Sequence, residues 1–332
     1  MEKKKGAIIM AIKLGVDVGN SDTKTQNTST PSGYHIQSNK PRFEEEYLLY
    51  KNNYYVPTET RFPFLMDKTE DDRCIILTLF GIAKQLIYFI KSDLAARGIP
   101  ANEQNIQAEI SKIKKISLGA GLPIGHCDNL AKKTRDYYMF KFEGGTSFSY
   151  NGYNFNLSLE RCKIFPQDII AVFATTDSEI TSKFSSYYTV GIGGYTVDIC
   201  PVIKNKPDKS RCRSIDLGTT VMYNDIRQKV LGEDGLTIAD NTIEAVLFGK
   251  ETILSEKIKN SILGCAKKHA DNIINTCKSN GFEFREAPVI FVGGGGLLLK
   301  RHLQENPLVS KCEFITDINA NAVAYAKYVE MD

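Results

Sequence analysis

The chain opens with a strand that runs into a glycine turn: Ile12-Lys13-Leu14-Gly15-Val16-Asp17-Val18-Gly19-Asn20-Ser21-Asp22-Thr23-Lys24. We expect a second strand from Thr23. The backbone N–H groups of such a turn can approach phosphate oxygens closely, because glycine leaves space beside the backbone. Asp17 can hold the water shell of Mg²⁺, and Lys24 can reach a phosphate as a point charge. The alternative is a plain hairpin with a solvated lysine, and this stretch alone does not decide between the two.

A second stretch repeats this outline far along the chain: Gly191-Ile192-Gly193-Gly194-Tyr195-Thr196-Val197-Asp198 follows the apolar residues 188–190. Two such hairpins that face each other would clamp a polyphosphate from both sides. The alternative for this stretch is again a hairpin with a glycine bulge. The repetition of the outline favours the functional interpretation.

A third stretch, Val292-Gly293-Gly294-Gly295-Gly296-Leu297, follows the apolar residues 288–291. Four consecutive glycines carry a large entropic cost, which favours a function over an ordinary surface loop. A strand that leads through glycines into a helix brings the backbone close to a flat or charged ligand. The stretch lacks the G-x-G-x-x-G spacing and its acidic partner, so a dinucleotide-binding fold is disfavoured.

Two shorter segments are weaker signals. Ile164-Phe165-Pro166-Gln167-Asp168 places the amide of Gln167 between the two halves of the chain, where it can orient a water molecule. Asp317-Ile318-Asn319-Ala320-Asn321-Ala322 begins the last expected helix with small residues that permit close packing. In isolation, a helix that starts after Pro166 and a helix cap at Asp317 are the simpler interpretations.

Composition bounds the class of protein. The 332 residues are 42% hydrophobic and 24% charged, which is typical of a globular chain of about two domains. The 42 Lys and Arg nearly balance the 39 Asp and Glu, so no broad basic field for direct nucleic-acid binding is expected. None of the 8 Cys forms a C-x-x-C pair, which favours reduced cytosolic thiols over zinc or disulfides. Lys13 and Asp17 follow the short apolar run at 6–10, and residues 74–90 are typical of a buried helix; a cytoplasmic protein with no membrane partner is therefore expected.

The remaining pattern is that of an α/β chain built by duplication, with strand, hairpin, helix, strand and helix in each half. A long helix is predicted from Asp71 or Asp72 to Gly98-Ile99-Pro100. Residues 29–72 are interpreted as an inserted subdomain. Turns between paired strands are predicted at Gly144-Gly145 and Asn151-Gly152, and long helices over 219–231 and 251–279.

Taken in their order along the chain, the five segments resemble the phosphate-1, connect-1, phosphate-2, adenosine and connect-2 motifs of the actin, heat-shock chaperone and sugar kinase superfamily. Within it, the chain looks most like the ParM-like bacterial actins. The details that carry this are residues 15–20, Gly121-Leu122-Pro123, Phe165-Pro166-Gln167 and Ala320-Asn321-Ala322. The resemblance covers nearly the whole chain.

The resemblance implies an actin-like fold of class α/β, in which two duplicated RNase H-like domains with small inserted subdomains flank a nucleotide cleft. Domain I would comprise residues 1–170, with the insertion at about 29–72, and would be closed by a C-terminal helix over 318–332. Domain II would comprise residues 171–317, with an insertion at about 225–255.

The resemblance also implies a role for each matching residue. Asp17 and Asp198 would order Mg²⁺, and Gln167 and Asp17 would be catalytic, with Gln167 positioning the attacking water. The residues implied to contact the nucleotide are Gly19, Asn20, Ser21, Thr23, Lys24, Gly193, Gly194, Tyr195, Thr196, Gly218, Gly293, Gly294, Gly295 and Gly296.

One position departs from the family pattern. Most relatives have aspartate at the start of the second loop, in the pattern D-x-G-G-x-x-x-D, whereas this chain has Gly191; Asp198 matches the second acid. Hydrolysis is therefore expected to be slow, unless another carboxylate substitutes. Nucleotide binding is the safer expectation.

The function that the resemblance implies is an ATPase that uses ATP or GTP with Mg²⁺ and joins head to tail into filaments. Such filaments would separate plasmid copies, linked to DNA by a small adaptor protein bound at a centromere-like site. Segments 29–72 and 225–255 are the expected filament contacts. Two alternatives stay open: a small-molecule kinase on the same scaffold, and a nucleotide-binding regulator that does not polymerise.

Overall fold

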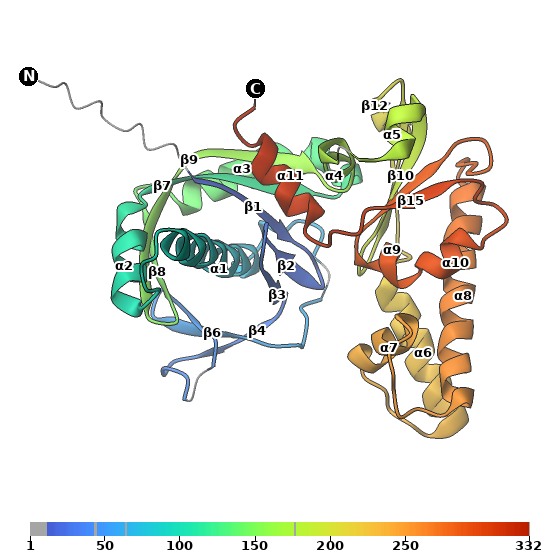
Figure 1. Ribbon diagram of the computed structural model, residues 1–332, viewed down its shortest axis with the longest axis horizontal. Coiled ribbons are helices and arrows are strands. Elements are labelled where there is room, and N and C mark those ends of the chain that lie inside the picture. Colours follow the sequence, from blue (N-terminus) through green and yellow to red (C-terminus); the bar gives the residue numbers. More distant parts are fainter. Residues whose placement is uncertain (1–11, 43–44, 64, 176, 332) are drawn as a thin grey trace, which may run out of the picture.

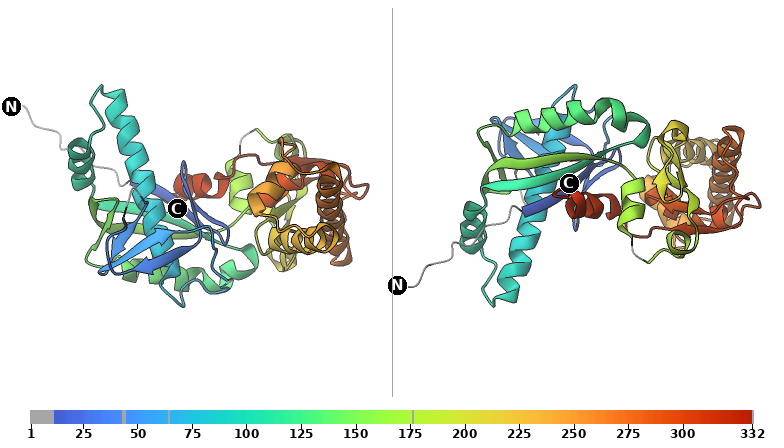
Figure 2. Two further views of the ribbon diagram at one scale, coloured as in Figure 1. Left: turned by 90° about the horizontal axis from the view of Figure 1, so that it is seen from below. Right: turned by 90° about the horizontal axis from the view of Figure 1, so that it is seen from above.

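The computed structural model describes residues 12–42, 45–63, 65–175 and 177–331, which form two halves that lie side by side (Figures 1 and 2). Residues 1–11, which include the short apolar run near the N-terminus, lie outside the described residues, as does Asp332 at the end of the predicted last helix. Each half is built on one β-sheet, and the C-terminal helix lies on the first half (Figure 1).

The first sheet has nine strands in the described part of the chain, in the order β3-β2-β1-β7-β9-β8-β5-β6-β4. β1, β7 and β9 run parallel, and the other neighbours pair antiparallel. The strands are β1 (Ile12–Val18), β2 (Asp22–Lys24), β3 (Ser29–Pro31), β4 (Tyr34–Gln37), β5 (Leu48–Tyr50), β6 (Asn53–Pro57), β7 (Lys115–Leu122), β8 (Thr146–Tyr150) and β9 (Tyr153–Pro166).

The second sheet has the order β12-β11-β10-β14-β15, with β13 also paired to β11. Its strands are β10 (Ser186–Ile192), β11 (Val197–Ile203), β12 (Lys206–Pro207), β13 (Arg213–Ile215), β14 (Val289–Val292) and β15 (Cys312–Phe314). This order, with two antiparallel and then two parallel neighbours, repeats that of β3-β2-β1-β7-β9. The predicted α/β fold with duplicated halves is therefore confirmed.

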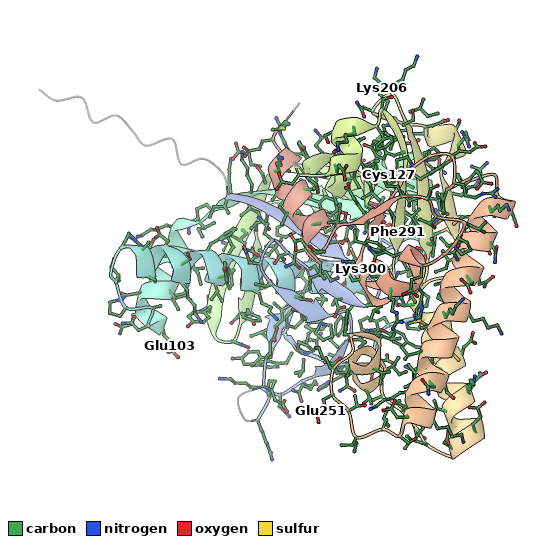
Figure 3. All side chains as sticks on the ribbon, turned by 45° about the vertical axis from the view of Figure 1, so that its right-hand side comes forward. Glu103, Cys127, Lys206, Glu251, Phe291 and Lys300 are labelled. Carbon is green, nitrogen blue, oxygen red and sulfur yellow. The ribbon has the colours of Figure 1, made fainter. Side chains whose placement is uncertain are left out.

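Helices cover the sheets. They are α1 (Arg73–Ala96), α2 (Glu103–Lys112), α3 (Ile124–Lys141), α4 (Ile169–Ala174), α5 (Glu179–Lys183), α6 (Thr219–Asp234), α7 (Asp240–Leu247), α8 (Glu256–Ser279), α9 (Gly294–Leu298), α10 (Lys300–Gln304) and α11 (Ala320–Tyr328), with a 3-10 turn at Lys209–Arg211. In the second half, Phe291 of β14 lies in a core with residues of α6 and α8 (Figure 3).

The long helix α1 begins and ends as its sequence signals predict. The Asp71 carboxylate accepts a hydrogen bond from the backbone N–H of Arg73 at 2.9 Å, and Gly98 follows the helix with φ of 68°. By length and composition α1 is apolar enough to cross a membrane, but 78% of its most apolar 18 residues are buried in the protein. It is the core helix of the first half.

Two segments differ from the prediction, and a third confirms it. Gly144-Gly145 does not join two strands: α3 continues to Lys141, because Tyr138 is buried in the first core. Asn151-Gly152 is the predicted hairpin turn, with φ of 47° and 89° at its two residues. The predicted helix over 251–279 begins only after Ser255, whose hydroxyl accepts from the N–H of Ile258 at 3.4 Å.

Segment 29–72, expected as an inserted subdomain, shares the first sheet and its core. β3 pairs with β2, and β5 pairs with β8, so its strands extend the sheet at both ends. Leu48, Tyr50 and Tyr55 are buried in the same core as α1. No second hydrophobic core is therefore needed to stabilise these residues.

The C-terminal helix α11 packs directly on the backbone of β1 and β7. A Cβ built at Gly15 would overlap the carbonyl oxygen of Ala322 and lie 2.7 Å from its carbonyl carbon. A Cβ at Gly119 would lie 2.7 Å from the carbonyl oxygen of Tyr325. Only glycine permits this approach. The first half is therefore completed by a helix that comes after the whole second half in the sequence.

We expect Gly15→Ala to lower the free energy of unfolding by about 2–3 kcal/mol, because the new methyl group must displace the α11 backbone. Gly264→Ala in α8 is the matched control, since no atom lies within 4 Å of its added Cβ. In urea unfolding the control should be as stable as the wild type, or more stable by up to about 1 kcal/mol. Equal unfolding midpoints for both variants would contradict the close packing of α11.

Candidate functional site

The two glycine hairpins face each other across a cleft between the halves. A Cβ built at Gly194 would lie 2.7 Å from Ser21 Oγ, so the β10–β11 turn meets the β1–β2 turn at this point. The cleft has an empty volume of about 1200 Å³. The predicted site residues that line it are Asp17, Gly19, Asn20, Ser21, Lys24, Gln167, Gly193, Gly194, Tyr195, Thr196, Asp198, Gly293, Gly294 and Gly295.

Three predicted site residues are not part of the cleft lining. Thr23 is buried, and its hydroxyl shares a hydrogen bond of 3.0 Å with Ser32 Oγ. Gly218 lies behind the second loop, where any side chain would overlap the Gly194 carbonyl. The N–H of Gly296 donates to the carbonyl of Gly293 within the first turn of α9. These residues shape the loops that surround the cleft.

The first loop owes its tight turn to Gly19. Its N–H donates to the Asp22 carbonyl at 3.1 Å, and a Cβ here would lie 2.7 Å from that oxygen. Its carbonyl accepts from Ser32 Oγ at 2.6 Å. The N–H of Gly19 is thus used within the turn. Asn20 and Ser21 at the tip of the turn, with Lys24 on β2, are left to meet a ligand.

The second loop is tied to the start of α6. The Gly193 carbonyl accepts from the N–H of Thr219 at 3.0 Å, and the Gly194 carbonyl accepts from that of Thr220 at 2.8 Å. These bonds satisfy two N–H groups at the α6 N-terminus that have no partner within the helix. The positive end of the α6 dipole therefore lies directly behind the loop, and Thr219 itself lines the cleft.

The third loop forms a wall of bare backbone. Gly293 has φ of 89°, a value that favours glycine. A Cβ at Gly295 would lie 2.7 Å from Thr219 Cγ2, so α9 packs tightly against the start of α6. Gly294, in contrast, has no atom within 4 Å of an added Cβ. It presents open space to the cleft, as a flat ligand requires.

Three carboxylates and two amides meet where the halves join. Gln167 Nε2 donates to Asp17 Oδ1 at 2.6 Å. Asn321 Nδ2 donates to Asp17 Oδ2 and to Asp168 Oδ1, both at 3.2 Å. Asp198 accepts hydrogen bonds from Thr196 Oγ1 at 2.9 Å and from the hydroxyl of Ser214. The amide that is predicted to orient water is therefore bonded to the carboxylate that is predicted to order the metal.

Burial disfavours the charged form of two of these carboxylates, Asp168 and Asp198. Desolvation raises the pKa of Asp168 to about 7; repulsion from Asp198 and Asp17 adds to this rise, while Asn321 and Lys24 oppose it. Desolvation also raises the pKa of Asp198, against hydrogen bonds from Ser214 and Thr196. A cation bound in the cleft would relieve this repulsion.

The donor set fits a hydrated Mg²⁺ better than an enclosed metal site. Among the described residues there is no group of three or more His, Cys, Asp or Glu side chains that could hold a metal ion. Mg²⁺ commonly keeps several waters and uses only one or two carboxylates together with substrate phosphates. Asp17 and Asp198, both nearly buried and both lining the cleft, could fill that part.

Three residues that matter to this geometry were not predicted from the sequence: Asp168, Arg61 and Asn321. Asp168 and Asn321 lie within two of the five motif segments, but neither was assigned a role. Arg61 belongs to segment 29–72 and matches no motif, so no local signal could have identified it. Its contact with the other half depends on tertiary structure alone.

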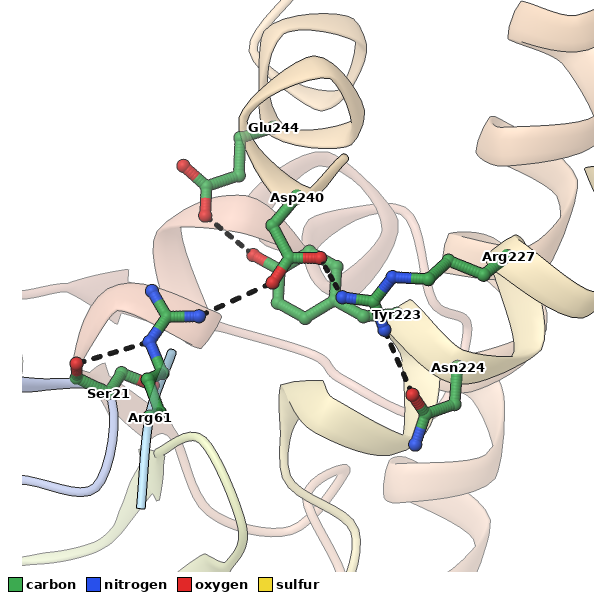
Figure 4. Close-up of polar contacts among 7 residues, drawn as sticks. All are labelled: Ser21, Arg61, Tyr223, Asn224, Arg227, Asp240 and Glu244. Atoms are coloured by element: carbon green, nitrogen blue, oxygen red, sulfur yellow. Dashed lines mark hydrogen bonds and ion pairs between the residues drawn. The ribbon is translucent and has the colours of Figure 1, made fainter. Parts of the chain in front are cut away.

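Arg61 links the two halves beside the cleft (Figure 4). Its Nε donates to the Ser21 carbonyl at 3.2 Å, and its Nη1 lies 3.3 Å from Asp240 Oδ2 at the start of α7. Arg227 of α6 pairs with the other oxygen of Asp240. On the same side, the Tyr223 hydroxyl donates to Glu244 Oε1 at 2.8 Å. A charged contact therefore bridges the first loop and the helices of the second half.

We expect Asp168 to make stability depend on pH. Because its pKa is about 7 in the folded chain and near 3.8 ordinarily, the folded state binds the proton more tightly. Its contribution to stability is thus full below pH 4 and is lost as pH rises toward 7, by at most about 4 kcal/mol.

Asp168→Asn removes this titration, so the stability of the wild type relative to this variant should fall between pH 4 and pH 7. Asp216→Asn, which changes an exposed carboxylate, should follow the wild type. Urea unfolding at several pH values measures both. A constant difference between wild type and Asp168→Asn would show that this carboxyl has an ordinary pKa.

Comparison with known proteins extends this description. Residues 189–305 match the family model for the C-terminal part of the MreB-like archaeal actin homologue. No curated protein matches the sequence.

Several solved structures are similar over nearly the whole chain. The archaeal actin homolog Ta0583 has a TM-score of 0.71 at 16% identity, over 96% of this chain and 98% of that one. ParM in a 15-stranded filament from Clostridium botulinum has a TM-score of 0.68 at 18% identity, over 97% and 100%. Bacillus thuringiensis ParM with ATP has a TM-score of 0.62 at 14% identity, over 96% and 97%. The chain therefore has the actin fold, and the resemblance to actins that its motifs indicate is confirmed at the level of fold.

Proposed function

We propose that the chain is a nucleotide-dependent actin-like ATPase that forms filaments and uses ATP or GTP with Mg²⁺. The observation that carries the proposal is the contact between the two glycine hairpins, Gly194 against Ser21, beside Asp17 and Gln167. Similar structures support it, since Ta0583 was solved in complex with ADP and Bacillus thuringiensis ParM with ATP.

Phosphoryl transfer to water needs positioning and charge stabilisation more than covalent help from the protein. In the proposed site Asn20, Ser21 and Lys24 hold the phosphates from one side, and the second loop in front of α6 holds them from the other. Mg²⁺, ordered by Asp17 and Asp198, would offset the charge that develops on the phosphates. The Gln167 amide orients the attacking water, because an amide is too weak a base to remove its proton.

Binding between two halves couples the nucleotide to a hinge. The proposed filament forms by a head-to-tail contact, which repeats without closing into a ring. Both segments expected to make this contact expose apolar side chains: Ile36 is 58% exposed in segment 29–72, and Phe248 and Ile253 are 50% and 105% exposed in segment 225–255. The Clostridium botulinum ParM, whose structure is a filament, supports self-association.

At a finer level, we propose that the filament segregates plasmid DNA in the cytoplasm through a small DNA-binding adaptor at a centromere-like site. The formal net charge of +3 supports an indirect link to DNA, because direct binding to the phosphate backbone depends on clustered Lys and Arg.

We expect ATP or GTP with Mg²⁺ to bind in titration calorimetry and to produce a threshold concentration for light scattering. Ile253→Lys should raise or abolish the threshold while leaving the heat of binding unchanged. The control is Phe140→Lys, an exposed apolar site on α3 outside both segments.

No heat with either triphosphate would refute the proposal. Binding without any threshold would favour the non-polymerising regulator, and phosphate transfer to an added sugar or acid would favour the small-molecule kinase.

For Gln167→Ala we expect unchanged nucleotide affinity and phosphate release slowed by about 100-fold, because the water loses its orienting amide. A coupled phosphate assay measures the rate, and calorimetry on the same sample measures the affinity. Release at the wild-type rate would remove Gln167 from the mechanism.

A further inference from the structure

The departure at Gly191 has a counterpart in the structure. Gly191 lies at the end of β10, opposite Asp198 on β11 and Val292 on β14. A Cβ built there would overlap Oδ2 and Cγ of Asp168 and lie 3.1 Å from Asp168 Cβ. The space in which a side chain at position 191 would begin is therefore filled by the carboxylate of another residue.

Asp168 is held in this position by an unusual backbone. Its φ of 62° and ψ of −53° lie where non-glycine residues are uncommon and cost free energy. Its N–H donates to Asn321 Oδ1 at 2.9 Å, and its Oδ1 accepts from Asn321 Nδ2 at 3.2 Å. One amide side chain of α11 thus binds both the backbone and the carboxylate of Asp168. The strain is maintained by specific contacts at the cleft.

The carboxylate lies among the groups of the proposed site. Asp168 lines the same cleft as Gln167, Lys24 and Gly193. Its immediate neighbour Gln167 donates a hydrogen bond to Asp17. Asn321 donates hydrogen bonds to both Asp17 and Asp168. The Gln167 amide and the Asp168 carboxylate are therefore linked to each other through Asp17 and Asn321, and both line the cleft.

We propose that Asp168 supplies the carboxylate that the second loop lacks at Gly191, and that it accepts a hydrogen bond from the attacking water. This inference rests on the proposed ATPase function. It makes Asp168 a catalytic residue beside Gln167, and it makes Gly191 a position that must be glycine as long as Asp168 is present.

The step balances without a further reactant. The water oxygen forms a bond to the terminal phosphorus as the bond from that phosphorus to the bridging oxygen breaks, and the electron pair leaves on the nucleoside diphosphate. Asp168 takes one proton from the water and returns it to the released phosphate. A carboxylate can serve as the general base for this exchange, and Asp168 lines the cleft with Gln167.

The test moves the carboxylate between the two positions. Asp168→Gly suits the positive φ at that position, and Asp168→Asn tolerates it while removing the charge. We expect both variants to fold and to bind nucleotide within a few-fold of the wild type, and to hydrolyse it at least ~100-fold more slowly. Gly191→Asp alone should lose both stability and hydrolysis, because its side chain overlaps Asp168.

The double variant Asp168→Gly with Gly191→Asp restores a carboxylate to the same space and should recover hydrolysis to within about tenfold of the wild type. Thermal unfolding of every variant identifies any that fails to fold. A purely structural Asp168 would give a different pattern, in which Asp168→Asn keeps the wild-type rate. That result, or a folded double variant with no recovery, would overturn the inference.

The two proposals fail in different ways. A wild-type protein that binds no nucleotide refutes the proposed function and this inference together. A wild-type protein that binds and hydrolyses nucleotide, with Asp168 variants that do so equally fast, refutes only the inference. Binding without any hydrolysis by the wild type also overturns the inference, but leaves nucleotide binding in place.

Discussion

The close packing of α11 on β1 and β7 is the constraint on which the site depends. Because Gly15 and Gly119 let the helix approach the sheet backbone, Asn321 at its start reaches the carboxylates of Asp17 and Asp168. Asp17 then holds Gln167. The cleft therefore takes its shape from three distant parts of the sequence, and a small shift of α11 would separate the amides from the carboxylates that they orient.

The features that could be predicted from the sequence were those that depend on local backbone conformation. Glycine turns after apolar strands predicted the three loops, and the repeated order of elements predicted the duplicated halves. Glycine, however, serves both ligand approach and chain packing. Gly218, which the resemblance implied to contact the nucleotide, packs behind the second loop instead. Arg61 and Asn321 act only through tertiary contacts, which no local pattern encodes.

Two contacts of different kinds join the halves at the first loop. The approach of Gly194 to Ser21 is steric, and it sets how narrow the cleft can become. The pair between Arg61 and Asp240 is partly exposed and is therefore worth no more than about 1 kcal/mol, less at high salt. Because the Ser21 carbonyl also accepts a hydrogen bond from Arg61, a ligand that moves the first loop also acts on the ionic contact. Movement of the first loop thus acts on an ionic contact of only modest strength.

Carboxylates at positions 168 and 191 would compete for the same space at the cleft. Side chains from both positions would overlap, and their like charges in a buried site would raise each other's pKa. This chain carries the acid at position 168 and glycine at position 191, which avoids both the overlap and the repulsion. Position 168 requires a left-handed backbone and an amide from α11 to hold it, whereas position 191 needs only a regular strand. The strained backbone at Asp168 persists because Asn321 of α11 binds it. Glycine at position 191 and asparagine at position 321 are therefore both required for the Asp168 carboxylate to lie where it does.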